Sequence, residues 1–316
     1  MGESYTGTVK MDVDHALVRY LEAKRTVDDR SFSRRVREIL TELLPPEPQI
    51  IDIGAGTGAT VPRLLDLGIG GSYRGIDSSE QLTAYAHAVR SRELRFRDFE
   101  VTTAPEYKFT VSNISGTDTD TDTNTTSDAE SSLDVVFETD DALAAASDAD
   151  DIDLLMAQQF MDLVPIEQAL GVFLDALRPG GLAYFPLTFD GTTVFQPDHP
   201  ADDAVETAYH DAIDAVPDRD SHAGRHLLDT LRNRPGAVRA VDAADAVVYP
   251  QENRYTGDEQ YYLQQLLTFV EETVTSDAVP EIDDWLASRR QQISDGVLSY
   301  VGHRYDILYQ TSTERS

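Results

Sequence analysis

The strongest constraint on the fold is the segment at residues 50–58, which reads IIDIGAGTG. An apolar run that ends in glycines is typical of a buried parallel strand followed by a tight turn. Because glycine has no Cβ, Gly54, Gly56 and Gly58 allow the backbone to turn sharply and to approach a ligand closely. The segment therefore predicts an α/β protein with a ligand site at the end of this strand.

Asp52, two residues before the first glycine, favours one kind of ligand. A carboxylate beside the turn repels a pyrophosphate and attracts a cation such as a sulfonium or an amino group. This favours S-adenosylmethionine over a dinucleotide. The glycine spacing alone leaves both open, because Gly54, Gly56 and Ala59 also satisfy the looser pattern of NAD and FAD sites.

The next two predicted strands both end in acids. Residues 73–77 read as a second strand that ends at Asp77, and an acid there accepts hydrogen bonds from ribose hydroxyls in either type of cofactor fold. A third strand is expected within residues 133–142. Asp141, at its carboxyl end, is placed to hold an adenine amino group, and Asp140 is the fallback.

A fourth strand is expected at 152–158, followed by a helix and a fifth strand at 182–189. Residues 178–181, which read RPGG, end that helix and lead tightly into the fifth strand, a junction that a dinucleotide domain does not need. This order of features resembles the class I S-adenosylmethionine-dependent methyltransferases. The resemblance covers about residues 46–190 and the last strand.

The resemblance implies how the cofactor would be held. Asp52 and the glycines would line its methionine side, Asp77 would hold the ribose, and Asp141 the adenine. The long separation of Asp77 from Asp141 departs from the family pattern. The complete set of cofactor-side residues predicted in this way is Asp52, Gly54, Ala55, Gly56, Gly58, Asp77, Ser78, Asp140, Asp141, Ala142 and Gln158.

The resemblance also implies a doubly wound α/β fold. Its sheet would have seven strands, mostly parallel, in the order 3-2-1-4-5-7-6, with an antiparallel last strand. The expected parts are a helical lid (1–45), a cofactor-binding core (46–190), a substrate cap (191–298) and a terminal edge strand (299–316). For residues 20–30 of the lid, a salt-bridged helix–helix turn is an equal alternative.

Residues 94–132 look like an insertion into the core. The alternating segments 94–99 and 107–111 suggest a hairpin. The acidic tract at 115–124 has almost nothing apolar to bury, and we expect a mobile loop there.

The charge of the chain bears on its environment and partners. The sequence holds 57 acidic and 26 basic residues, for a formal net charge of −31, and its only lysines are Lys10, Lys24 and Lys108. Such chains resemble proteins of salt-in halophiles, whose cytoplasm screens charge over only ~3 Å at 1 M salt. We therefore expect the acidic residues to form a solvated surface of the halophilic type. Because a basic stripe is missing, nucleic acid is a disfavoured partner.

The chain contains no cysteine. Disulfides, thiolate metal sites, thiolate nucleophiles and a three-cysteine iron–sulfur cradle are therefore excluded. No apolar run approaches ~20 residues and the N-terminus lacks a signal-peptide pattern. These features predict a soluble cytoplasmic protein without a membrane partner.

Substrate contacts are expected beyond the carboxyl ends of the strands. Asp190 and Phe189 follow the fifth strand, although a turn acid and a core aromatic residue are equal alternatives for them. His210 is a candidate general base, because an unperturbed imidazole titrates near neutral pH. Arg225, or Arg219, is a candidate for bidentate binding of a carboxylate or phosphate of the substrate.

These assignments make Asp190, His210 and Arg225 the predicted catalytic residues. Gln158, Gln159, Phe160 and Asp162 follow the fourth strand and are expected near the transferring methyl group. No metal site is expected, because Gly224 interrupts the helical spacing of His222 and His226.

The sequence thus predicts methyl transfer from S-adenosylmethionine to a small-molecule acceptor, with S-adenosylhomocysteine as the product. Methyl transfer depends on positioning and exclusion of water, so no universal catalytic residue is expected. A motif of the type Asn/Asp-Pro-Pro-Tyr/Phe is absent after the fourth strand, which disfavours methylation of adenine or glutamine amino groups. An NAD-linked oxidoreductase and a non-catalytic protein that binds S-adenosylmethionine or S-adenosylhomocysteine stay open as alternatives.

Overall fold

The computed structural model describes residues 16–113 and 132–314 of the chain. Its strands are β1 (Gln49–Ile53), β2 (Gly71–Asp77), β3 (Phe99–Ala104), β4 (Lys108–Asn113), β5 (Ser132–Thr139), β6 (Ile152–Met156), β7 (Leu177–Gln196), β8 (Gly236–Ala243), β9 (Ala246–Val248) and β10 (Ser299–Thr311). Its helices are α2 (Arg25–Ser31), α3 (Arg34–Leu43), α4 (Thr60–Asp66), α5 (Glu80–Phe96), α6 (Ala142–Ser147), the short 3-10 helix η1 (Met161–Leu163), α7 (Ile166–Asp175), α8 (Asp202–Asp214), α9 (Ala223–Arg232), α10 (Glu259–Thr273) and α11 (Ile282–Ser294). Residues 16–23 are also helical.

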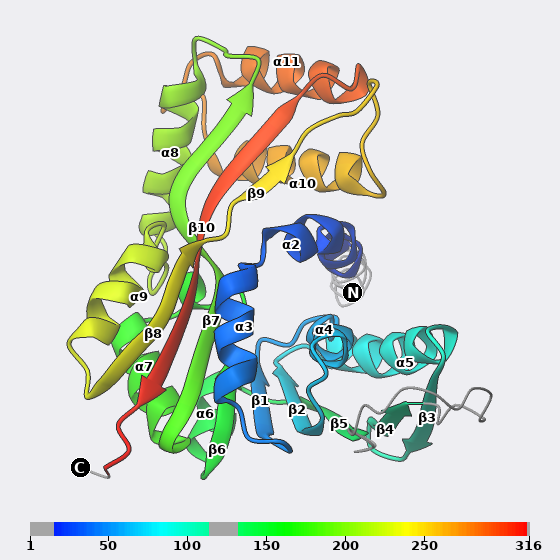
Figure 1. The fold of residues 1–316 in the computed structure, drawn as a ribbon. Helices are drawn as coiled ribbons and strands as arrows, with labels where there is room; N and C mark the ends of the chain where they lie inside the picture. The colour runs from blue at the N-terminus through cyan, green and yellow to red at the C-terminus, as the bar shows by residue number, and fades with distance from the viewer. Residues whose placement is uncertain (1–15, 114–131, 315–316) are drawn as a thin grey trace, which may run out of the picture.

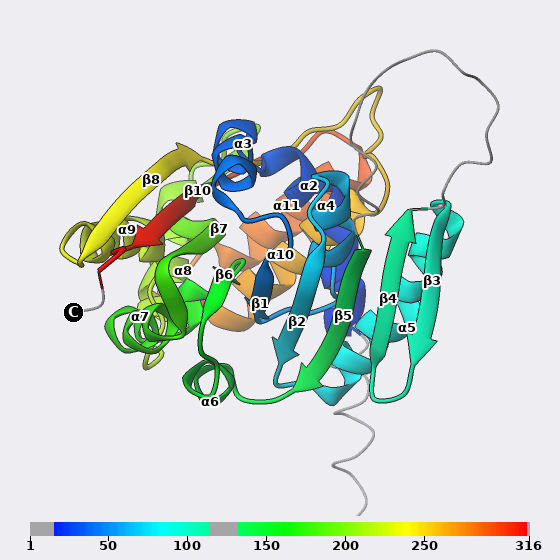
Figure 2. The same cartoon turned by 60° about the horizontal axis from the view of Figure 1, so that its bottom comes forward.

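The strands form one mixed sheet, so the α/β class is confirmed. Its order is β3-β4-β5-β2-β1-β6-β7-β10-β8, and β9 pairs with β10. Strands β5, β2, β1, β6 and β7 are parallel to one another, whereas β10 is antiparallel to β7 and to β8. Figure 2 shows the strands from β8 at one edge to β3 at the other.

The expected seven-strand order is corrected to a ten-stranded sheet. The difference comes from additions: β3 and β4 pair antiparallel with each other, and β4 extends the sheet beyond β5, while β9 pairs with the outer half of β10. The predicted hairpin is present, but its first strand begins at Phe99 because residues 94–96 end α5. The acidic tract 115–124 lies outside the described residues.

Helices cover both faces of the sheet. One apolar core joins β1, β2 and β5 to the inward sides of α3, α4 and α5, including Leu40, Leu64 and Leu94. The other joins the opposite face to α6, α7 and α9, including Phe173 and Leu227. This double covering explains why the central strands are apolar on both faces.

Strands β7 and β10 continue beyond the main sheet into a second lobe (Figure 1). There they pack with α8, α10 and α11 around a third apolar core that includes Tyr262, Trp285 and Tyr300. The expectation that the fifth strand ends at Phe189 is therefore wrong. Asp190 lies inside β7, because β10 pairs with that strand as far as Gln196.

The N-terminal segment lies between the two lobes, and Figure 1 shows α2 between α10 on one side and α4 on the other. Arg30 pairs with the buried Glu259 of α10 at 2.6 Å, and Arg25 pairs with Glu93 of α5 at 3.0 Å. A side-chain cap begins α3, where the Ser33 hydroxyl accepts the N–H of Val36. The segment is thus tied to both lobes.

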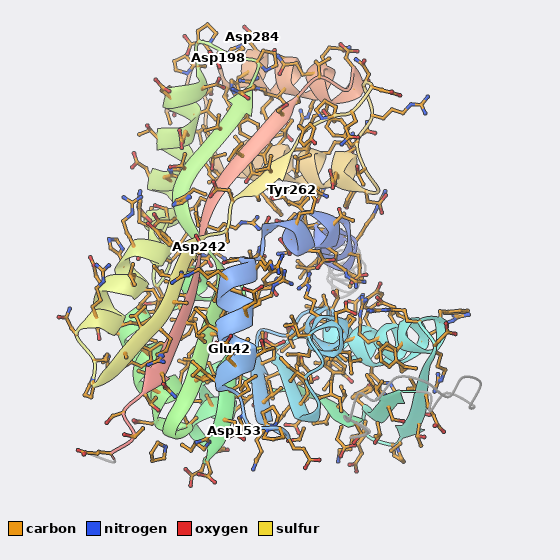
Figure 3. The ribbon with its side chains drawn as sticks, in the orientation of Figure 1. Glu42, Asp153, Asp198, Asp242, Tyr262 and Asp284 are labelled. Atoms are coloured by element: carbon orange, nitrogen blue, oxygen red, sulfur yellow. The ribbon has the colours of Figure 1, made fainter. Side chains whose placement is uncertain are left out.

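Exposed acids are spread over the molecule. Glu42 on α3, Asp242 on β8, Asp284 on α11 and Asp198 before α8 are all exposed and lie on separate elements (Figure 3). Among the described helices, none has the length and apolar character needed to cross a membrane.

Candidate functional site

The turn after β1 forms one wall of a cavity of about 430 Å³. Gly54 and Gly56 line this cavity with φ of +70° and +55°, and the N–H of Ala55 donates to the carbonyl of Ile76 on β2 at 2.8 Å. A Cβ on Gly54 would lie 2.7 Å from Cδ2 of Phe160. The glycine is therefore required by both backbone conformation and space.

Asp77, at the end of β2, fixes the same turn. Its carboxylate accepts the N–H of Gly56 and the N–H of Ser79, each at 2.9 Å. Burial raises the pKa of Asp77, and these two hydrogen bonds oppose that rise. Asp77 and Ser78 both line the cavity.

Asp52 lies beneath the turn and is 1% exposed. The Tyr73 hydroxyl donates to its Oδ2 at 2.7 Å. Burial raises the pKa of Asp52 from 3.8 to about 6, although the hydrogen bond from Tyr73 favours the charged form. Asp52 is thus a partly desolvated carboxylate at the floor of the cavity.

Residues that follow β5 and β6 complete this wall of the first cavity. Asp141 caps α6 by accepting the N–H groups of Leu143 and Ala144, both at 3.0 Å. The Gln158 side-chain oxygen accepts from Nη1 of Arg63 at 3.0 Å. Asp140, Asp141, Ala142 and Gln158 all line the cavity.

Every predicted cofactor-side residue except Gly58 belongs to the described lining of this cavity. Gly58 has φ of +72°, and a Cβ there would lie 2.6 Å from Cζ of Phe137 and 3.0 Å from Cβ of Ala86. This glycine therefore allows close packing between the turn, β5 and α5.

The N-terminal segment closes part of the cavity. For residues 20–30 of this segment the sequence predicted either a lid or a salt-bridged helix–helix turn. Leu21, Lys24, Arg25 and Asp28 line the cavity together with Gln159. These helical residues meet the glycine turn because the segment is tied to both lobes. Lys24 and Asp28 have the i,i+4 spacing of a helical ion pair, whereas their contacts with Gln159 could not be read from local spacing.

Asp28 is the centre of a buried charge network. Its carboxylate lies 3.0 Å from Nη1 of Arg304 on β10 and 3.6 Å from Nζ of Lys24. It also accepts from Nε2 of Gln159 at 3.1 Å, and Lys24 donates to Oε1 of Gln159. Burial disfavours the charged form of Asp28, but the charges of Lys24 and Arg304 outweigh burial and lower its pKa.

A second cavity of about 470 Å³ adjoins the first. Leu21, Lys24, Gln159 and Leu163 line both cavities. The rest of its lining includes a group of aromatic residues, which we call the aromatic wall and which come from segments far apart in the sequence: Tyr20, Phe189, Phe195, Tyr209, Tyr262, Phe269 and Tyr300. Figure 3 labels Tyr262 on α10, in the second lobe. Its hydroxyl accepts from Nη2 of Arg304 at 3.2 Å.

Asp162, on η1, also lines the second cavity. Its Oδ1 is buried and has no hydrogen-bond partner within residues 16–113 and 132–314. Burial raises the pKa of Asp162, and a hydrogen bond from its own backbone N–H opposes that rise, as do the charges of Lys24, Arg219 and Arg304.

The predicted catalytic residues lie elsewhere. Asp190 is 2% exposed and pairs with Arg225 at 2.9 Å. The ring of His210 lies 5.8 Å from that of Phe189 and 6.1 Å from that of His222. Burial lowers the pKa of His210. None of Asp190, His210 and Arg225 belongs to the lining that the described residues give either cavity.

Among the described residues, no group of three or more potential metal ligands is found. His222 Nδ1 lies 2.9 Å from the Ser221 hydroxyl, and His226 Nδ1 lies 2.6 Å from Asp220 Oδ2. Each of these histidines thus has its own polar neighbour.

No protein-family model and no curated protein matches the chain. Among solved structures, it is similar to a candidate methyltransferase from Bacillus halodurans C-125, with a TM-score of 0.50 and 10% identity over 89% of this chain and 100% of that chain. A weaker likeness is geranyl diphosphate C-methyltransferase from Streptomyces coelicolor A3(2), with a TM-score of 0.42 and 14% identity over 87% of this chain and 77% of that chain. Another is a candidate sarcosine dimethylglycine methyltransferase from Galdieria sulphuraria, with a TM-score of 0.44 and 9% identity over 89% of this chain and 87% of that chain. The first likeness shows a shared methyltransferase fold; at such identities it extends to the fold alone.

Proposed function

We propose that the protein transfers a methyl group from S-adenosylmethionine to a small-molecule acceptor. The observation that carries this proposal is the pair of adjoining cavities, which share Leu21, Lys24, Gln159 and Leu163. The glycine turn and the strand-end acids line the first cavity, and an aromatic wall lines the second. Ligands in the two cavities would meet at the shared residues.

The first cavity has the size and chemistry for this cofactor. Its volume of about 430 Å³ is within the range of ~300–1,000 Å³ that is usual for small-molecule sites. In this proposal, Asp52, Gly54 and Gly56 face the methionine part, Asp77 binds the ribose, and Asp141 holds the adenine. When bound, S-adenosylmethionine supplies a methyl carbon attached to a positively charged sulfur.

The protein's own residues would act by positioning and by excluding water. Leu21 and Lys24 cover the shared wall, and Lys24 is held there by Asp28 and Gln159. An in-line displacement depends on the alignment of acceptor and methyl group, so a closed wall at this point would contribute to the rate.

The Asp52 carboxylate disfavours the NAD-linked alternative. Asp52 lines the first cavity beneath the glycine turn, and a carboxylate there would repel the two negative charges of a pyrophosphate. The second cavity favours an enzyme over a non-catalytic binding protein, because it offers room for an acceptor next to the methyl donor.

A turnover assay distinguishes the proposed enzyme from a non-catalytic binding protein. The protein would be incubated in concentrated KCl with methyl-labelled S-adenosylmethionine and pools of small aromatic and apolar acceptors. Salt is used because a net charge of −31 destabilises a compact state when it is unscreened. We expect label in a small-molecule product and an equal amount of S-adenosylhomocysteine. Tight cofactor binding without transfer to any pool would instead support the non-catalytic alternative.

A further inference from the structure

Asp162 is the one acid of the second cavity that combines burial with a free acceptor atom among the described residues. Its Oδ1 is buried without a partner. The other acid of this lining, Glu272 on α10, is exposed. Because an unpartnered buried carboxylate oxygen is costly, such an atom calls for a hydrogen-bond donor.

The position of Asp162 is fixed by a backbone hydrogen bond and by the burial of the residue before it. Its backbone carbonyl accepts the N–H of Asp220 at 3.2 Å, and Met161 beside it is buried in the core of the sheet. Leu163, directly after it, and Gln159, three residues before it, line both cavities. Asp162 therefore belongs to the segment that forms part of the shared wall.

The charges around Asp162 limit the kind of donor. Lys24, Arg219 and Arg304 all act on it electrostatically, while Lys24 and Arg304 are themselves paired with Asp28. A cationic ammonium would meet these three positive groups, whereas a neutral hydroxyl would not. The aromatic wall in turn favours a flat apolar body.

We propose that the acceptor is an aromatic small molecule with a hydroxyl group, and that Asp162 Oδ1 binds this hydroxyl and takes its proton. The proposal rests on the proposed function and names the substrate class and a catalytic residue for it. The acceptor oxygen forms a bond to the methyl carbon while the carbon–sulfur bond breaks and its electron pair stays on sulfur. The hydroxyl proton moves to Asp162 and then to solvent, so the products are a methyl ether and a neutral thioether.

The test compares binding of three naphthalene probes in concentrated KCl with S-adenosylhomocysteine present. The probes are 2-naphthol, its methyl ether 2-methoxynaphthalene, and the cationic 2-naphthylmethylamine. The variants are Asp162→Asn, which keeps the side-chain shape, and Asp284→Asn as the matched control, at an exposed acid of α11 that belongs to the described lining of neither cavity. Affinity for S-adenosylhomocysteine and the thermal midpoint are measured for each protein.

For the natural protein we expect 2-naphthol to bind more tightly than the other two probes. Asp162→Asn should weaken 2-naphthol about tenfold or more, as expected for a hydrogen bond to a charged group, and leave 2-methoxynaphthalene and S-adenosylhomocysteine unchanged. Asp284→Asn should change none of these three affinities.

Three results would overturn the inference: no binding of 2-naphthol, equal weakening of 2-naphthol and its methyl ether by Asp162→Asn, or a preference for the amine. If S-adenosylhomocysteine itself does not bind, the proposed function fails instead. The two failures are thus distinguishable.

Discussion

The two cavities are built in different ways. The first takes its polar residues from the ends of neighbouring parallel strands and from the turns that follow them, such as Asp52, Gly54 and Asp77. The second takes Tyr20, Tyr262 and other aromatic residues from segments that meet only in the folded chain. A site of the first kind leaves a local pattern in the sequence, whereas a site of the second kind does not.

The largest effect expected at the first cavity is on stability. Asp52→Asn should raise the free energy of unfolding by about 3 kcal/mol above pH 6. The reason is that burial raises the pKa of Asp52 from 3.8 to about 6, and each pKa unit of this rise costs the folded state ~1.4 kcal/mol. As the pH falls, Asp52 binds a proton in the folded state before the unfolded state does. The gain should therefore shrink below pH 6 and vanish near pH 3.8. Denaturant unfolding of both proteins across this range measures the difference, and a gain that does not depend on pH would contradict the assigned cause.

The next largest effect concerns the glycine turn. Gly54→Ala should lower affinity for S-adenosylhomocysteine about 30-fold, since Phe160 must move away from a Cβ at 2.7 Å and the positive φ adds strain of ~1–3 kcal/mol. Gly68→Ala is the matched control, with φ of +71° and nothing within 4 Å of the added Cβ. Calorimetric titration of both variants gives the comparison. Equal affinity losses would mean that strain, and not the site, is responsible.

A smaller loss is expected at the end of β2. Asp77→Asn should weaken S-adenosylhomocysteine about tenfold, because the ribose hydroxyls lose a charged acceptor. Asp153→Asn is the control: Asp153, labelled near the bottom of Figure 3, accepts the N–H of Gln49 at 2.8 Å and belongs to the described lining of neither cavity. If both variants bind equally well by calorimetry, the ribose assignment is wrong.

The smallest effect tests whether the two cavities are separable. Tyr262→Phe removes the hydroxyl that accepts from Arg304 at 3.2 Å, and the cost in stability should be about 1 kcal/mol. Tyr262 belongs to the second cavity, so affinity for S-adenosylhomocysteine should change less than twofold, while 2-naphthol binding weakens a few-fold. An equal effect on both ligands would show that the cavities act as one site.

The sequence predicted the first cavity well because its chemistry is local. Asp52, Asp77 and Asp141 each lie at or just after the carboxyl end of a strand that an apolar run predicts. Parallel strands bring their carboxyl ends to the same edge of the sheet. The exception is Gly58, whose spacing matches the ligand turn but whose hydrogen faces Phe137. Spacing alone does not tell a ligand contact from a packing contact.

The second lobe could not be predicted in the same way. The true end of β7 depends on pairing with β10, more than a hundred residues later, so Asp190 looked like a strand end although it lies within the strand. Asp190 and Arg225 are drawn together because α9 packs on β7, where the N–H of Arg225 also donates to the Asp190 carboxylate at 2.8 Å. Their catalytic assignment stays a prediction, as does that of His210.

Asp28 shows the same limit at a single residue. It belongs to the segment 20–30, for which the sequence predicted a lid or a salt-bridged helix–helix turn, yet it pairs with Arg304, 276 positions away, at 3.0 Å. Only the tertiary fold brings that cation to the helix. Asp162, by contrast, was expected near the methyl group from its place after β6, and it lines the second cavity.

The most direct test of the central claim is a calorimetric titration of the protein in concentrated KCl with S-adenosylmethionine, S-adenosylhomocysteine and NADH. The account predicts that both sulfur nucleosides bind and that NADH does not, because the Asp52 carboxylate lies beneath the glycine turn, where it would repel a pyrophosphate. Binding of NADH, or of none of the three, would contradict the assignment of the glycine turn to a methyl donor.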